Sequence, residues 1–222
     1  MLSPKAIIFD FDGVLLESEF ESNQHLAHLL TELGHPTDPE EALANFSGLA
    51  GNDFMTAVET RIGRPLPPEF RNRRKKEAQR ALRDGIAAVD GAIEFVLSLP
   101  ESLPRAVASS SSTNWIRTHL ENLSLGEAFG DYLYSGAEHV ERGKPAPDLY
   151  LLAARQLAVP IEQCVILEDS EVGATGALAS GATVIGLAAG LHCLHDHGDR
   201  LHALGVKHVA HSFEEVKQLL DL

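Results

Sequence analysis

Short apolar runs alternate with stretches of helical periodicity along most of the chain. An apolar run of about four to eight residues without polar alternation is typical of a strand buried on both faces. Such runs predict strands at 5–10, 105–109, 131–135, 164–169, 182–187 and 207–211. Helical patterns follow at 91–99, 113–124, 147–158, 171–180 and 213–221. Strands that alternate with helices in this way indicate a parallel sheet with helices on both faces.

One long stretch breaks the alternation because it is helical throughout. Its helical patterns cover 18–34, 38–46, 52–62 and 67–84. The pattern predicts an α/β fold: a Rossmann-like, doubly wound parallel sheet core, residues 1–15 and 89–222. An all-helical cap domain, residues 16–88, is inserted after the first strand. An insertion there emerges at the carboxyl end of the strand, where ligands bind in open α/β sheets.

Composition and charge narrow the range of partners. The 222 residues are 44% hydrophobic and carry a formal net charge of −14, which argues against nucleic acid or an anionic membrane as a general partner. A small anionic substrate would need local positive charge or a metal ion. We expect a cytoplasmic protein, because the chain has only two cysteines, no apolar run of about 18 residues and no signal peptide. For the oligomeric state, a monomer is the default expectation.

Two of the predicted strands end in pairs of acidic residues, Asp10 with Asp12 and Glu168 with Asp169. Side chains two apart in an extended chain point the same way, so we expect Asp10 and Asp12 to lie together. A divalent cation would remove the repulsion, and Mg²⁺ takes carboxylate and phosphate oxygens. Two alternatives remain open: Asp10 and Asp12 merely end a strand, and Asp169 and Ser170 both cap the helix that starts near residue 171.

Hydroxyl groups and a lysine accompany the carboxylates. Serines 109–112 end another strand, where hydroxyl and backbone N–H groups can form an anion cradle, although a serine-rich helix cap would have the same sequence. Lys144 precedes a helix that begins near Pro147, and a surface lysine in a turn is the simpler alternative. Two carboxylates, a hydroxyl, a lysine and an acidic metal-binding pair together suit phosphoryl transfer.

Four segments resemble, in the right order, the four motifs of the haloacid dehalogenase superfamily: DFDGV, VASSS, GKPAPD and LEDSEVGATGALASGA. The resemblance covers the whole chain, including the place of the helical insertion. The closest subgroup by pattern is the helical-cap enzymes related to β-phosphoglucomutase and to phosphoglycolate and sugar phosphatases.

This resemblance implies a role for each matching residue. Asp10 resembles the nucleophile that forms an aspartyl-phosphate. Asp12 resembles the general acid/base, which protonates the leaving alkoxide and then activates water. Ser109 matches the hydroxyl that binds the phosphoryl group, with Ser110 beside it as a second substrate-binding residue. Lys144 matches the lysine that balances the charge of the nucleophile and the phosphate.

The resemblance also implies a Mg²⁺ site. Asp169 with Glu168 matches the metal-binding pair, and Asp10 and the backbone carbonyl of Asp12 complete the ligand set. One aspartate of the first motif can bind the metal while the other starts protonated. Gly13 lets the chain turn away beside the substrate.

The resemblance favours a Mg²⁺-dependent phosphatase acting on a small phosphorylated metabolite, a sugar or sugar-acid phosphate. The related mutases have histidine where this chain has Ser22 and an arginine where it has Gly51. A β-phosphoglucomutase-like phosphomutase is the alternative, and a non-catalytic binding module is less favoured. Dehalogenases of the superfamily do not use the second aspartate or the magnesium cluster. Glu17 stands where the family often has aspartate, a difference that the sequence does not explain.

Two further segments stand out. The basic run RNRRKK, residues 71–76, predicts a solvated helix face, or a site from which Arg74 or Lys75 binds an anionic leaving group. The histidine-rich segment LHCLHDHGDRLH, residues 191–202, has spacing that suits a transition metal, but histidines in a solvated connection are the simpler interpretation.

Overall fold

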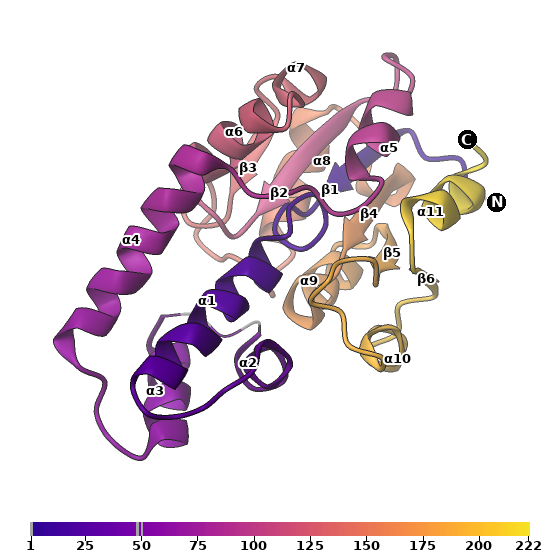
Figure 1. Cartoon of the computed structure of the whole chain (residues 1–222). Coiled ribbons are helices and arrows are strands. Elements are labelled where there is room, and N and C mark those ends of the chain that lie inside the picture. Colours follow the sequence, from indigo (N-terminus) through magenta and orange to yellow (C-terminus); the bar gives the residue numbers. More distant parts are fainter. Residues whose placement is uncertain (1, 48, 50) are drawn as a thin grey trace. The chain divides into compact units, whose positions relative to one another are not determined.

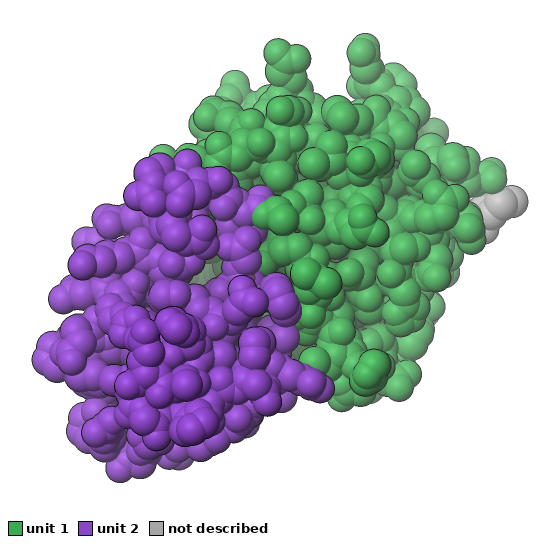
Figure 2. Space-filling model, viewed as in Figure 1, with its two compact units in different colours: residues 1–17, 87–222 green, residues 18–86 purple. Residues whose placement is uncertain are grey.

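The computed structural model describes residues 2–47, 49 and 51–222 of the chain. The chain forms two compact units, residues 1–17 with 87–222 (unit 1) and residues 18–86 (unit 2), coloured separately in Figure 2. The interpretation of these units as a core and a cap stays a prediction. None of the described helices is both long and apolar enough to cross a membrane.

Unit 1 contains a six-stranded parallel sheet with the strand order β3-β2-β1-β4-β5-β6 (Figure 1). Its strands are β1 (Ala6–Phe9), β2 (Arg105–Ser109), β3 (Leu133–Ser135), β4 (Cys164–Glu168), β5 (Thr183–Leu187) and β6 (His208–Ala210). Successive strands are added from β1 toward β3 on one side and from β4 toward β6 on the other, so the strand order reverses between β1 and β4. In open α/β sheets ligands bind at such a switch point. The predicted α/β fold with a parallel sheet is confirmed.

Helices cover both faces of the sheet in unit 1. They are α5 (Ala92–Ser98), α6 (Thr113–Asn122), α7 (Gly126–Phe129), α8 (Asp148–Gln156), α9 (Glu171–Ser180), α10 (His197–Ala203) and α11 (Phe213–Leu220). A short 3₁₀ turn, η1 (Ile161–Gln163), precedes β4. Ile8 packs with α8 and α9 on one face. Phe9, the next residue, points to the opposite face, where its ring contacts Phe95 of α5 and Phe129 of α7, with centroid distances of 6.1 and 5.4 Å.

Two helices of unit 1 are missing from the sequence prediction, α7 and α10. The second falls in the histidine-rich segment, whose residues His197, Gly198 and Asp199 are weak helix formers. Leu201 of α10 is fully buried in the same apolar cluster as residues of α8 and α9. Tertiary packing rather than local propensity therefore stabilises this helix. The outer strands β3 and β6 are also shorter than the apolar runs predicted.

Unit 2 consists of the four predicted helices, α1 (Ser18–Glu32), α2 (Pro39–Phe46), α3 (Gly51–Ile62) and α4 (Pro68–Asp84). Their apolar faces form a separate core that includes Leu26, Leu30, Phe46, Val58 and Phe70. This second core explains why the helical stretch forms a compact unit of its own.

The segment after β1 is tied to the segment that leads into α5. Glu17 N donates to Ala87 O at 2.9 Å, and Val89 N donates to Leu15 O at 3.2 Å. Before this pairing begins, the chain turns at Gly13, which has a φ of +87° that favours glycine. A Cβ atom at Gly13 would lie 2.2 Å from Asp169 Oδ2, so the turn also needs glycine for space. The turn therefore brings the end of β1 into direct contact with the end of β4.

Candidate active site

Asp10 and Lys144 form a buried ion pair at the carboxyl end of β1. Asp10 extends the pairing of β1 with β4, because its N–H donates to Leu167 O at 2.9 Å. Lys144 Nζ donates to Asp10 Oδ1 and, at 2.7 Å, to Glu168 Oε1. The Lys144 side chain is only 4% exposed, so the alternative of a surface lysine in a turn is wrong.

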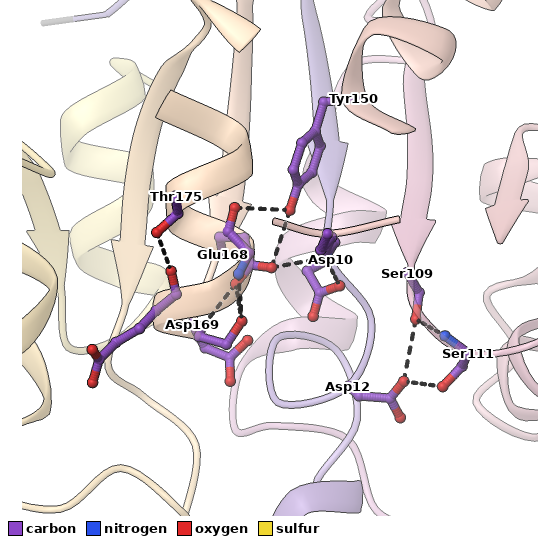
Figure 3. A network of polar contacts seen from close by, with 12 residues as sticks. Asp10, Asp12, Ser109, Ser111, Tyr150, Glu168, Asp169 and Thr175 are labelled. Atoms are coloured by element: carbon purple, nitrogen blue, oxygen red, sulfur yellow. Dashed lines mark hydrogen bonds and ion pairs between the residues drawn. The ribbon is translucent and has the colours of Figure 1, made fainter. Parts of the chain in front are cut away.

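Glu168 is fully buried and each of its oxygens has protein donors (Figure 3). Besides Lys144, Tyr150 donates its hydroxyl to Oε1 at 3.0 Å, and Ser170 donates both N–H and Oγ–H to Oε2 at 2.7 and 3.1 Å. Gly173 makes room for this carboxylate, because a Cβ atom there would lie 1.5 Å from Oε1. The helix that follows β4 is therefore built around the buried Glu168 side chain.

The alternative that Asp169 and Ser170 both cap this helix is right for Ser170 and wrong for Asp169. The N-cap of α9 is Ser170, whose side chain accepts from Gly173 N at 3.0 Å. Asp169 is 2% exposed, and its Oδ1 atom has no hydrogen-bond donor among the described residues. An acidic oxygen buried without a donor has lost its hydration without compensation from the protein.

Asp12 is turned toward Ser109 and Ser111 and has a different set of partners (Figure 3). Its Oδ2 atom accepts from Ser109 Oγ at 3.2 Å and from Ser111 Oγ at 2.6 Å. Its Oδ1 atom accepts from the indole Nε1–H of Trp115 at 3.0 Å. Ser110 is exposed, so the hydroxyl beside Ser109 that contacts Asp12 is that of Ser111. The serine-rich turn also caps α6, through Ser112.

Burial has the largest effect on the pKa values of Asp10, Asp169 and Lys144. It raises the pKa of Asp10 well above its usual range, and Glu168 and Asp169 raise it further while Lys144 lowers it. Burial and then Glu168 raise the pKa of Asp169 in the same way. Burial alone would lower the pKa of Lys144, but Asp10 and Glu168 outweigh it and the net shift is upward. One ammonium group thus faces three carboxylates.

These three carboxylates are suited to a divalent cation. Asp10, Glu168 and Asp169 each offer one oxygen, and these oxygens lie within 4.8 Å of one another. The donors are hard oxygens, which Mg²⁺, Ca²⁺ and Mn²⁺ prefer. Excess negative charge and the donor-free Oδ1 of Asp169 both fit a bound cation at this position.

The interpretation of the histidine-rich segment as a solvated connection is wrong for two of its histidines. His192 and His197 are 6% and 9% exposed, because both rings contact Asp169, the residue that follows β4. His195 and His202 are exposed, as expected. Periodicity could not distinguish the two kinds, since burial here depends on β4 lying beside the segment.

Arg74 and Lys75 belong to unit 2 and have different surroundings. Arg74 donates to Ser22 O at 2.9 Å and to Ser22 Oγ at 2.7 Å, and its guanidinium lies over the Phe54 ring, 5.6 Å from the centroid. It lines a hollow of about 400 Å³ within unit 2, together with Asn23. Lys75 is exposed. The role of either residue in substrate binding stays a prediction.

Sequence reasoning missed Ser111, Trp115, Tyr150 and His192, all of which contact the predicted site residues. Ser111 belongs to the serine run that was singled out. The position of Trp115, in the first turn of the helix after that run, was the available signal for its contact with Asp12. Nothing in the sequence pairs Tyr150 or His192 with the carboxylates, because their contacts cross between separate elements.

Residues 7–187 match the family model of haloacid dehalogenase-like hydrolases. The chain belongs to this family. The predicted family, fold and hydrolase class are thereby confirmed.

Several proteins of the haloacid dehalogenase-like family are similar to this chain over most of its length. Hexitol phosphatase A of Escherichia coli is 31% identical, with 83% of each chain covered. The 6-phosphogluconate phosphatase of Escherichia coli is 28% identical, covering 85% of this chain and 84% of that protein. A hydrolase of the family from Deinococcus radiodurans, solved with bound phosphate and sodium, is 32% identical with a TM-score of 0.87, covering 99% and 96% of the two chains.

The raised pKa of Asp169 leads to a prediction about stability. In the metal-free protein at pH 8, we expect Asp169→Asn to raise the melting temperature by about 2–6 °C, because it removes a buried negative charge. A carboxyl whose pKa is raised by folding contributes stability at low pH that is lost as the pH rises through the folded pKa. The advantage of the asparagine should therefore shrink as the pH is lowered toward about 4, the unfolded pKa.

Thermal unfolding in EDTA from pH 5 to pH 8 measures this difference. Asp131→Asn is the matched control, since the Asp131 side chain is 99% exposed and its loss should change little. A lower melting temperature of Asp169→Asn at pH 8 would contradict the electrostatic argument.

Proposed function

We propose that this protein is a Mg²⁺-dependent phosphatase that hydrolyses small phosphorylated sugars or sugar acids through an aspartyl-phosphate on Asp10. The main support for this proposal is that two carboxylates at the same edge of the sheet have different hydrogen-bond partners. Asp10 is paired with Lys144, whereas Asp12 accepts from two serines and an indole. Different environments for neighbouring carboxylates allow one to act as nucleophile and the other as acid and base.

In this proposal Asp10, Glu168, Asp169 and the backbone carbonyl of Asp12 hold Mg²⁺. When bound, the ion supplies positive charge that offsets the negative charge of the carboxylates and of the phosphoryl group. Lys144 supplies a further charge beside the nucleophile, and its upward pKa shift keeps it protonated at neutral pH. The hydroxyl of Ser109, with Ser110 beside it, binds the phosphoryl oxygens.

The reaction then has two steps. The Asp10 carboxylate attacks phosphorus, the ester P–O bond breaks, and Asp12 gives its proton to the leaving alkoxide. In the second step Asp12 takes a proton from a water molecule, whose oxygen attacks phosphorus and releases inorganic phosphate and the Asp10 carboxylate. Asp12 is protonated again at the end, so the cycle closes without any other reactant.

The partners of Asp12 suggest which oxygen carries the proton. Serine hydroxyls donate or accept, so Ser109 and Ser111 tolerate either protonation state at Oδ2. The indole of Trp115 can only donate, and therefore keeps Oδ1 as an acceptor. Asp12 would thus carry its proton on Oδ2. The Trp115 ring is itself held edge-on against buried His119, with centroids 4.3 Å apart.

The substrate class rests on two supports. Two of the relatives reported above are a 6-phosphogluconate phosphatase and a hexitol phosphatase. The hollow of unit 2 combines polar groups, those of Ser22, Asn23 and Arg74, with the aromatic rings of Phe54 and Phe70, a lining that suits a polyhydroxylated leaving group. Of the two predicted cap residues, Arg74 is the better candidate to bind this group, because Lys75 lies in solvent.

The first test is phosphate release from a panel of hexose, hexitol, sugar-acid and phosphoglycolate monoesters. We expect release from a small subset, with loss of more than about a thousandfold in Asp10→Asn and in EDTA, because nucleophile and metal are both essential. Conversion of β-glucose 1-phosphate to glucose 6-phosphate without release would favour the mutase instead. No turnover in either assay would favour a binding module.

Trp115→Phe tests the assignment of the Asp12 proton. Loss of one hydrogen bond to a carboxylate costs about 1.5–3 kcal/mol, so we expect kcat to fall about 10- to 100-fold with KM little changed. The pH profile of kcat should shift as well, since an acceptor at Asp12 has lost its donor. An unchanged kcat and pH profile would show that the indole has no part in positioning Asp12.

Arg74→Ala and Lys75→Ala form a matched pair on the same helix. We expect the Arg74 variant to raise KM for the best substrate at least tenfold, because one charge-assisted contact is worth about 1.5–3 kcal/mol. The Lys75 variant should leave KM within about twofold. Equal KM values for the two variants would contradict a substrate role specific to Arg74.

A further inference from the structure

Two buried histidines contact Asp169 from the segment that follows β5. The Nε2–H of His192 donates to Asp169 Oδ2 at 2.8 Å, and the Nε2–H of His197 donates to the backbone carbonyl of Asp169 at 2.6 Å. The two rings are perpendicular, with centroids 5.5 Å apart. Both the side chain and the main chain of Asp169 are therefore held by donors from outside its own element.

The ring of His192 fits between two glycines. A Cβ atom at Gly190 would lie 2.6 Å from both Cε1 and Nδ1 of the ring, and one at Gly13 would lie 2.9 Å from Cε1. Neither distance is possible for ordinary contacts, so both positions need glycine for the ring to lie where it does. A ring confined in this way directs Nε2 at Oδ2 of Asp169, with Cys193 Sγ at the longer distance of 3.4 Å from the same nitrogen.

The backbone next to His192 is held as well. Leu191 N donates to Oε1 and Oε2 of Glu17, at 3.2 and 3.1 Å, and Glu17 is 5% exposed. Leu191 is 63% exposed, so apolar burial at this residue does not hold the segment. The buried glutamate therefore has a structural reason: it reaches from the end of the turn after β1 to the peptide that precedes His192.

The hydrogen bond from His192 divides the two oxygens of Asp169 between two tasks. Oδ2 accepts from the imidazole, whereas Oδ1 has no donor among the described residues. Oδ1 is thus the oxygen left for a cation shared with Asp10 and Glu168. A carboxylate whose second oxygen is fixed loses less rotational freedom when it binds a metal.

We propose that His192 is a positioning residue that orients the Asp169 carboxylate for Mg²⁺ through its hydrogen bond to Oδ2. This inference rests on the proposed function for the identity of the ion. Groups that orient metal-binding side chains typically contribute about 10- to 100-fold to metal affinity. His192 itself contacts neither the metal nor the substrate in this role.

A competing interpretation is that His192, Cys193 and His197 bind a transition metal themselves, since their donor atoms lie within 4.8 Å of one another. The structure favours the positioning role, because the Nε2 atoms of both histidines already donate to Asp169. A metal bound through these Nε2 atoms would have to displace both hydrogen bonds.

Calorimetric titration of the metal-free protein with MgCl₂ tests the proposal without relying on turnover. We expect His192→Leu to raise the dissociation constant of Mg²⁺ about 10- to 100-fold. His192→Gln should stay within about threefold of the wild type, because the glutamine amide can donate from nearly the same place as Nε2. His195→Leu, the same change at an exposed histidine of the segment, should have no effect.

Circular dichroism and melting in EDTA show whether each variant is folded before it is titrated. Wild-type affinity in folded His192→Leu would overturn the proposal, and so would equal losses in the leucine and glutamine variants, because packing rather than the hydrogen bond would then be responsible. Stoichiometric Zn²⁺ binding that Cys193→Ser abolishes would favour the competing site and overturn it too.

The wild-type titration separates this inference from the proposed function. If the wild-type protein binds no Mg²⁺ and releases no phosphate, both fail together. If it binds Mg²⁺ and His192→Leu binds it equally well, only the positioning role of His192 fails.

Discussion

Three carboxylates and one ammonium group are buried together where β1 and β4 end, and much of unit 1 is arranged around this imbalance of charge. Asp10, Glu168, Asp169 and the Lys144 side chain are each at most 8% exposed, so water cannot compensate their charges. Both carboxylate oxygens of Glu168 accept hydrogen bonds from the protein, whereas only Oδ2 of Asp169 does among the described residues. A site that leaves buried negative charge uncompensated has lower stability without a cation and a larger gain when one binds.

The surroundings of this cluster show how closely the backbone must approach it. A Cβ atom at Gly13 would collide with Asp169, and one at Gly173 would collide with Glu168. A Cβ atom at Gly190 would collide with the ring of His192. These glycines come from three separate segments, after β1, in α9 and after β5. Each allows a polar side chain from another element to reach a carboxylate, and together they make a dense polar network possible inside an α/β core.

The partners of Asp12 and the interior of unit 2 have a different character. Asp12 is held by two hydroxyls, from β2 and from the turn that follows it, and by the rigid indole of Trp115 in α6, rather than by a lysine. Unit 2 has its own core and its own hollow, in which Arg74 is held by Ser22 and Phe54.

The amino-acid sequence alone predicted the six strands, all the helices except α7 and α10, the helical insertion and the candidate residues Asp10, Asp12, Ser109, Lys144 and the pair Glu168–Asp169. These follow from local patterns: apolar runs, helical periodicity, polar residues at strand ends and, for Lys144, a motif before a helix. Only the tertiary structure decided that Ser111 and Trp115 contact Asp12, that α7 and α10 are helices and that His192 and His197 are buried. Those features depend on contacts between segments far apart in the chain, and residue spacing carries no information about which segments meet.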